Sequence, residues 1–233
     1  MMMKKEAFKT MSWSWKELLL LLLVAFVVVP IFIETQLHAL LFSRFQDSLY
    51  AGTSTGLAMA IVFTLAVYFL AIKPHRLGWK EVGIRAFSRG YWTRIVMWTL
   101  ALIVASGVIL TVMDLLNISW ENAKTKSIKT DMTWVTFLIG FVSSAVVSPV
   151  YEEIFYRGFL YKWMRINWGV SAGILISSAI FTAAHIPTYN TLPVNFITGA
   201  VFAWTYEKTG SIFPAMIIHG TFNGVAVILT ALA

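Results

Sequence analysis

Two adjacent glutamates and an arginine lie in an apolar part of the chain, in the stretch YEEIFYR at residues 151–157. Glu153 and Arg157 are four residues apart, so on a helix they lie one turn apart in the order that favours an ion pair. Glu152 is rotated by about 100° from Glu153 and therefore faces a different partner. We interpret Glu153 and Arg157 as a structural ion pair, which leaves Glu152 for chemistry.

Two later stretches supply imidazoles, FTAAH ending at His185 and HGTFN beginning at His219. Asn223 follows His219 by one helical turn and shares its face. Gly220 and Gly224 leave that helix thin, so another backbone or a substrate can approach it. Each signal alone is also explained by structure, as an interfacial ion pair, a packing histidine or an interhelical hydrogen bond. Their joint occurrence in one chain favours a functional site.

The residue types indicate hydrolysis by activated water. A carboxylate and an imidazole that share a water molecule can act as a general base. We expect Glu152 to accept the proton and His185 to orient the water, while His219 and Asn223 donate hydrogen bonds to the resulting oxyanion. The chain has no cysteine, so a thiolate nucleophile is excluded and activated water is favoured over covalent catalysis.

A zinc-dependent version of the same chemistry is the alternative. Two histidines and a carboxylate can hold zinc with one open position. The tightly spaced HExxH motif is missing, however. We therefore expect no cofactor and no metal site.

The composition identifies a membrane protein. Of the 233 residues 58% are hydrophobic and 12% are charged, whereas soluble domains carry roughly 25% charged residues. The net charge of +7 then indicates cytoplasmic loops rather than nucleic-acid binding. The first apolar run, residues 18–33, is longer than a signal-peptide core and lacks a cleavage site, so we expect a retained span.

Stretches of about twenty apolar residues predict an all-α, polytopic transmembrane helical bundle of seven to eight spans. The predicted spans are approximately 17–42, 52–72, 94–116, 134–163, 170–187, 193–207 and 211–231. Residues 1–233 form a single integral membrane domain, and residues 134–231 form a catalytic core that carries the motifs. If the fourth helix continues past Arg157 to about Trp163, a rise of 1.5 Å per residue brings Glu152, His185 and His219 to a similar depth.

The distribution of lysine and arginine predicts the orientation. Fourteen of these residues fall on one side of the predicted spans and four on the other. The positive-inside rule then places the N-terminus in the cytoplasm. The basic segment 73–94 is expected either to lie along the anionic inner leaflet or to act as an ordinary topology-setting loop.

The three motifs, in this order, resemble those of the CPBP family, the CAAX proteases and bacteriocin-processing enzymes also called Abi proteins. They are EExxxR at residues 152–157, FxxxH at 181–185 and HxxxN at 219–223. The resemblance covers about residues 134–231 and implies an intramembrane protease, often labelled a metalloprotease, whose site opens toward the cytoplasm. The family commonly has eight spans, one more than the seven segments given above.

The resemblance also implies roles and partners. The catalytic residues would be Glu152, His185, His219 and Asn223, with Glu153 and Arg157 in support. The partners would be the lipid bilayer and a membrane-bound or lipidated peptide, such as a prenylated CAAX protein, a signalling peptide or a bacteriocin. The expected location is a bacterial plasma membrane. Two other classes remain open, a non-enzymatic scaffold or immunity protein and a transporter with a proton relay.

Overall fold

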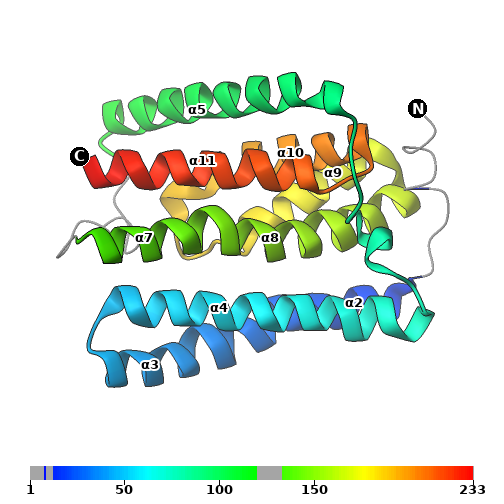
Figure 1. The fold of residues 1–233 in the computed structure, drawn as a ribbon, viewed down its shortest axis with the longest axis horizontal. Coiled ribbons are helices and arrows are strands. Elements are labelled where there is room, and N and C mark those ends of the chain that lie inside the picture. The colour runs from blue at the N-terminus through cyan, green and yellow to red at the C-terminus, as the bar shows by residue number, and fades with distance from the viewer. Residues whose placement is uncertain (1–7, 9–12, 120–132, 233) are drawn as a thin grey trace.

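The computed structural model describes residue 8, residues 13–119 and residues 133–232. Within these residues every regular element is helical and no strand occurs. The helices lie side by side, most of them along the long axis of the molecule (Figure 1). The predicted all-α helical bundle is therefore confirmed.

The first half of the chain forms three helical rods. The first rod consists of α2 (Trp15–Leu23), the π-type η1 (Val24–Leu37) and α3 (His38–Phe45). The second consists of α4 (Ser48–Ala66), the π-type η2 (Val67–Ile72) and the 3₁₀ turn η3 (Lys73–His75). After the separate 3₁₀ turn η4 (Trp79–Val82), the third consists of the 3₁₀ turn η5 (Arg89–Tyr91) and α5 (Trp92–Leu115).

The second half carries all the predicted site residues. Its elements are α7 (Trp134–Val142), the π-type η6 (Ser143–Val147), α8 (Ser148–Glu152), the π-type η7 (Glu153–Tyr161), α9 (Lys162–Ala183), the 3₁₀ turn η8 (Tyr189–Thr191), α10 (Leu192–Thr209) and α11 (Phe213–Leu232). The elements from α7 to α9 follow one another directly along the chain, but the backbone turns sharply at Gly169, where φ is 87° and ψ is 174°. These backbone angles are not helical, so this position divides the segment into two helices. Glycine adopts the positive φ without the steric cost that other residues incur.

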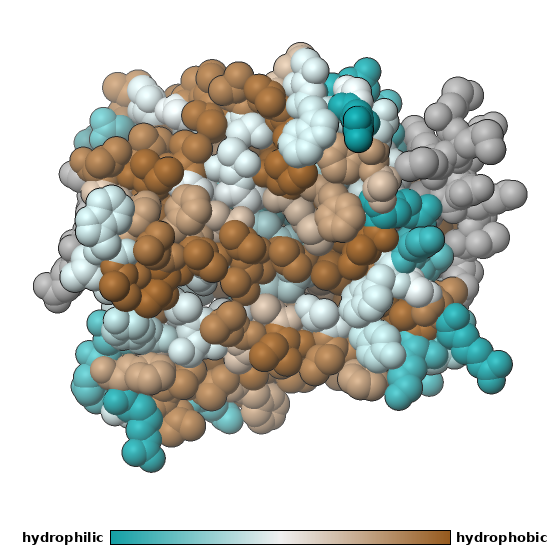
Figure 2. Space-filling model, in the orientation of Figure 1, coloured by the Kyte–Doolittle hydropathy of each residue, from teal (hydrophilic) through white to brown (hydrophobic). Residues whose placement is uncertain are grey.

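Among the residues that the structure describes, five rods are long and apolar enough to cross a membrane, namely Trp15–Phe45, Ser48–His75, Arg89–Leu115, Trp134–Ala183 and Phe213–Leu232. Gly169 divides the fourth rod and α10 adds a further helix, so each of the seven predicted segments corresponds to a helix, with ends that differ by up to several residues. α10 itself is not among the five apolar rods. The helix that carries the glutamates continues past Arg157 to Lys162 and beyond, as predicted. Figure 2 shows apolar side chains along the middle of the bundle and hydrophilic ones toward its ends.

Polar side chains mark where the rods begin. The Ser14 hydroxyl accepts a hydrogen bond from the N–H of Lys16, and the Glu17 carboxylate accepts one from the N–H of Ser14, at 2.6 Å. Asp47 caps α4 in the same way by accepting from the N–H of Tyr50. These caps satisfy N–H groups that have no partner within the helix.

The centre of the bundle is η7, in which all nine residues are buried. Phe155 packs edge-on against Phe63 of α4, with ring centroids 4.8 Å apart. At Gly158 an added Cβ would lie 2.5 Å from the carbonyl oxygen of Val82, so only glycine permits this contact. η7 is therefore held on one side by α4 and on another by the segment that contains η4.

That contact changes the interpretation of the basic segment 73–94, which was expected either to lie along the membrane surface or to act as an ordinary topology-setting loop. Its middle packs into the bundle, and Val82 is fully buried. Lys162 of α9 pairs with the Glu81 carboxylate, and the N–H of Ile212 donates to the carbonyl of Gly83 at 3.0 Å. The segment therefore joins η7 to the turn between α10 and α11.

Candidate active site

Glu153 and Arg157 form the predicted ion pair, and both are buried. Arg157 Nη1 donates to Glu153 Oε1 at 3.1 Å, and Nη2 donates to the carbonyl of Gly199 at 3.1 Å. The guanidinium also lies over the rings of Phe181 and Phe202, 4.4 Å and 5.0 Å from their centroids. One arginine thus connects η7 with α9 and α10, because a planar cation can stack and donate at the same time.

His219 supplies a contact that the sequence did not predict. Its Nδ1 lies 2.9 Å from Glu153 Oε1, and its ring stacks on Phe202 with centroids 4.7 Å apart. A carboxylate accepts hydrogen bonds, so Nδ1 carries the hydrogen and the lone pair of a neutral ring is on Nε2. Glu153 thereby orients the imidazole, in the way that outer carboxylates orient catalytic histidines.

Glu152 lies on the other side of the same ring. Its Oε2 is 3.8 Å from His219 Nε2, and its side chain is 13% exposed. This oxygen is buried and has no hydrogen-bond partner among the described residues. This separation is too long for a direct hydrogen bond, and a water molecule placed beside both atoms can hydrogen-bond to each of them. The adjacent glutamates therefore have different environments, as their rotation around the helix predicted.

His185 lies in a turn rather than in a helix, which corrects the predicted span 170–187. α9 ends at Ala183. Pro187 cannot continue a helix, and it disfavours helical backbone at the residue before it. His185 Nδ1 donates to the carbonyl of Phe181 at 2.8 Å, so the lone pair of the neutral ring is on Nε2. This bond also satisfies a carbonyl in the last turn of α9.

Asn223 is held against η6. Its Nδ2 donates to the carbonyl of Ser144 at 3.0 Å. One turn earlier on α11, an added Cβ on Gly220 would lie 2.3 Å from the carbonyl oxygen of Ala145. The predicted close approach of another backbone to this helix is therefore confirmed, and it places Asn223 beside η6.

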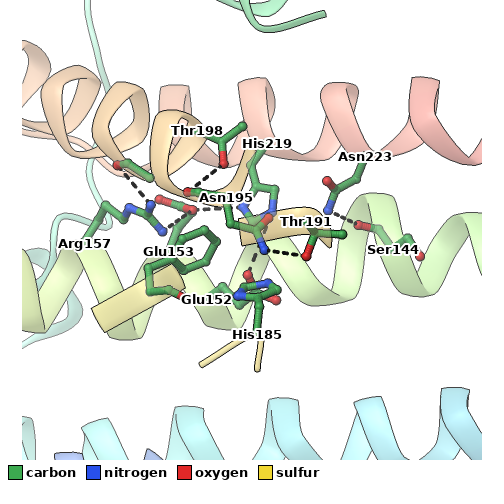
Figure 3. Close-up of polar contacts among 12 residues, drawn as sticks. Ser144, Glu152, Glu153, Arg157, His185, Thr191, Asn195, Thr198, His219 and Asn223 are labelled. Atoms are coloured by element: carbon green, nitrogen blue, oxygen red, sulfur yellow. Dashed lines mark hydrogen bonds and ion pairs between the residues drawn. The ribbon is translucent and has the colours of Figure 1, made fainter. Parts of the chain in front are cut away.

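The predicted residues gather between the helices (Figure 3). His185 and His219 both pack against Phe181, with ring centroids 4.8 Å and 6.2 Å from it. Glu153 contacts His219 and Arg157, while Glu152 faces His219. Elements η7, α8, α9 and α11 thus bring the acids and imidazoles together at one site.

α10 contributes residues that the sequence analysis missed. Asn195, Gly199 and Phe202 are spaced by four and three residues, so they share one face of this helix. Gly199 and Phe202 contact Arg157 and His219, and Figure 3 draws Asn195 between His219 and Thr191. The Asn195 amide donates to Thr191 Oγ1 at 3.1 Å. The spacing of asparagine and glycine was the available signal, but it does not say which face is turned inward.

In the part of the chain that the structure describes, no group of three or more histidine, aspartate or glutamate side chains is arranged to hold a metal ion. The polar side chains gathered at the site include carboxylates, imidazoles and amides.

The fold and the site define a class of protein, a polytopic helical membrane protein with a buried site of carboxylates and imidazoles. Residues 133–225 match the family model of the Rce1-like proteins, described as type II CAAX prenyl endopeptidases. This match contains all six predicted site residues and confirms the resemblance of this part of the chain to the CPBP, or CAAX protease, family. The comparisons with curated proteins and with solved structures gave no match.

Proposed function

We propose that the protein is an intramembrane endopeptidase that hydrolyses a peptide bond of a membrane-associated substrate. The match of residues 133–225 to the type II CAAX prenyl endopeptidases supports peptidase activity. The observation that carries the proposal is the position of Glu152, whose buried and unpaired Oε2 lies 3.8 Å from His219 Nε2. A carboxylate that faces an imidazole across this distance can bind and deprotonate a water molecule. The catalytic core is residues 134–231.

In the proposed reaction Glu152 takes a proton from water, and His185 orients the water through Nε2. The water oxygen forms a bond to the peptide carbonyl carbon, and the carbonyl oxygen becomes an oxyanion. The Asn223 amide donates to this oxyanion, as does His219 when Nε2 also carries a hydrogen. Collapse of the tetrahedral intermediate breaks the C–N bond, and Glu152 returns its proton to the leaving amine.

An apolar groove beside the site supports a lipidated or membrane-embedded substrate. The groove lies between α11 and the segment from α7 to α8 and has a volume of about 500 Å³. Its lining residues are apolar apart from Thr221, and they include Pro149 and Gly220, close in sequence to Glu152 and His219. We propose a prenylated CAAX-type peptide as the substrate, with the hydrocarbon chain in this groove.

The direct test replaces Glu152 with glutamine, which keeps the shape and removes the base. Purified wild-type protein in lipid should cleave a prenylated CAAX-type peptide, and Glu152→Gln should lower kcat at least 100-fold, because general-base catalysis contributes about 10²–10⁴-fold. The melting temperature should stay close to that of the wild type, since this oxygen has no partner among the described residues. Undiminished cleavage by Glu152→Gln would exclude the proposed role.

Metal dependence distinguishes the two versions of this mechanism. We expect catalysis without a resident metal, because a carboxylate and an imidazole suffice to activate water. Cleavage should therefore persist after exhaustive treatment with EDTA, and added zinc should not raise it. Loss of activity in EDTA with recovery on adding stoichiometric zinc would favour the zinc-dependent alternative.

A further inference from the structure

A second cavity lies away from the candidate active site, between α5 and α10. Its volume is about 350 Å³, and it is lined by Tyr91, Arg94, Met97, Trp98, Ala101, Trp204 and Lys208. On the inner side of this cavity, Tyr91 packs in a cluster with Phe202, whose ring stacks on His219. The cavity is therefore separated from the acids and imidazoles by a layer of packed side chains.

Each of the two helices contributes a cation and a tryptophan to this cavity. Arg94 and Trp98 are one turn apart near the start of α5, and Trp204 and Lys208 are one turn apart near the end of α10. Lys208 Nζ lies 3.8 Å from the centroid of the Trp204 ring. Both cations are at the same end of the bundle, the indole rings lie one turn deeper, and Met97 and Ala101 complete the apolar part of the lining.

The positive charge of this cavity is not neutralised within the described residues. No described carboxylate forms an ion pair with Arg94 or Lys208, although the chain neighbour Glu207 lies close. That carboxylate instead accepts from Arg165 at 3.1 Å and from the Tyr161 hydroxyl at 2.9 Å. Arg94 and Lys208 are both exposed, so their charges are available to a ligand.

We propose that this cavity binds the headgroup and upper acyl chain of an anionic phospholipid. Tryptophan is enriched at the interface between headgroups and hydrocarbon, and basic pockets between transmembrane helices are suited to acidic lipid headgroups. Here the phosphate lies between Arg94 and Lys208, and the chain follows Met97 and Ala101. Two cations without an acidic partner disfavour headgroups that carry a positive charge of their own.

The experiment measures lipid retention by the full chain in nanodiscs that contain phosphatidylglycerol and phosphatidylcholine, read by native mass spectrometry. Wild-type protein should retain phosphatidylglycerol selectively. The double variant Arg94→Gln with Lys208→Gln should bind it about 25-fold more weakly, since each such cation contributes about fivefold near an anionic lipid. The matched control, Arg76→Gln with Lys80→Gln, removes the same charge from exposed positions outside the cavity and should retain the lipid.

Equal retention by the wild type and the Arg94/Lys208 variant would overturn the proposal. An equal loss in the control would also overturn it, because it would reduce the effect to general surface charge. If a peptide carboxylate displaced the bound phosphatidylglycerol from the cavity, the cavity would be assigned to substrate binding instead. Melting temperatures of all variants, measured in the same nanodiscs, verify that each one is folded.

Discussion

Glu153 is the residue on which the site depends structurally, although it is not the proposed base. Its Oε1 accepts hydrogen bonds from Arg157 on its own helix and from His219 on α11. The pair with Arg157 follows from local helix geometry, whereas the bond to His219 requires α11 to lie against η7. One buried carboxylate thus orients the imidazole and balances the charge of the guanidinium.

Glu153→Gln should therefore destabilise the protein strongly, even though the side chain keeps its shape. Removing one member of a buried ion pair costs about 3–5 kcal/mol, because the other charge stays buried without compensation. Unfolding of the purified protein in detergent measures this loss. Adding Arg157→Met to Glu153→Gln should recover part of it. As a control, Asp114→Asn at an exposed position should change stability by less than about 0.5 kcal/mol.

At the scale of elements, the contact between α11 and η6 positions the imidazole and the amide. Gly220 lies against the carbonyl of Ala145, and Asn223 donates to the carbonyl of Ser144. A glycine removes the side chain at the contact, so two backbones approach closely. His219 precedes Gly220 directly, and its position relative to Glu153 depends on this approach.

Gly220→Ala tests this contact. The new Cβ would lie 2.3 Å from the carbonyl oxygen of Ala145, so the helices must separate, at a cost of about 1–3 kcal/mol. Cleavage should fall as well, because the separation moves His219 away from Glu153. The matched control is Gly107→Ala in α5, where a Cβ meets nothing within 4 Å and where alanine stabilises a helix by roughly 0.5–1 kcal/mol. Equal stability of the two variants would contradict the role of this contact.

At the scale of the whole molecule, the two ends of the bundle differ in charge. α2 begins at one end and α11 finishes at the other (Figure 1). Described cations at the first end include Lys16, Lys73, Arg76, Lys80, Arg85, Arg89, Arg94, Lys162, Arg165 and Lys208, whereas Arg44 is at the second. Predicted basic positions 4, 5, 9, 124, 126 and 129 lie outside the described residues. The positive-inside rule therefore predicts that the first end is cytoplasmic.

Labelling of single cysteines tests this orientation, because the natural chain contains none. Ser88→Cys and Ser48→Cys are nearly isosteric changes at exposed positions near the first and second ends. In intact cells a membrane-impermeant maleimide should label Ser48→Cys at once and Ser88→Cys only after permeabilisation. The opposite pattern would reverse the predicted topology and place the N-terminus outside.

The helices and the Glu153–Arg157 pair were predictable because both depend on residues that are close together in the sequence. Apolar runs of sufficient length must form helices in a bilayer, where every backbone group needs an internal partner. The separation of four residues then fixes which acid meets Arg157. The small residue at Gly220 likewise indicated a close helix contact, without identifying the partner helix.

Sequence alone determined a helical membrane protein with its acids, imidazoles and amide in three motifs. Only the tertiary structure decided that His219 is held by Glu153, that His185 lies in a turn beyond α9, that α10 turns Asn195 and Phe202 inward, and that Val82 packs against Gly158. The physical reason is that helix formation depends on neighbours within one or two turns. The partner of a buried polar group depends instead on how whole helices pack, and this is set by many contacts between distant residues.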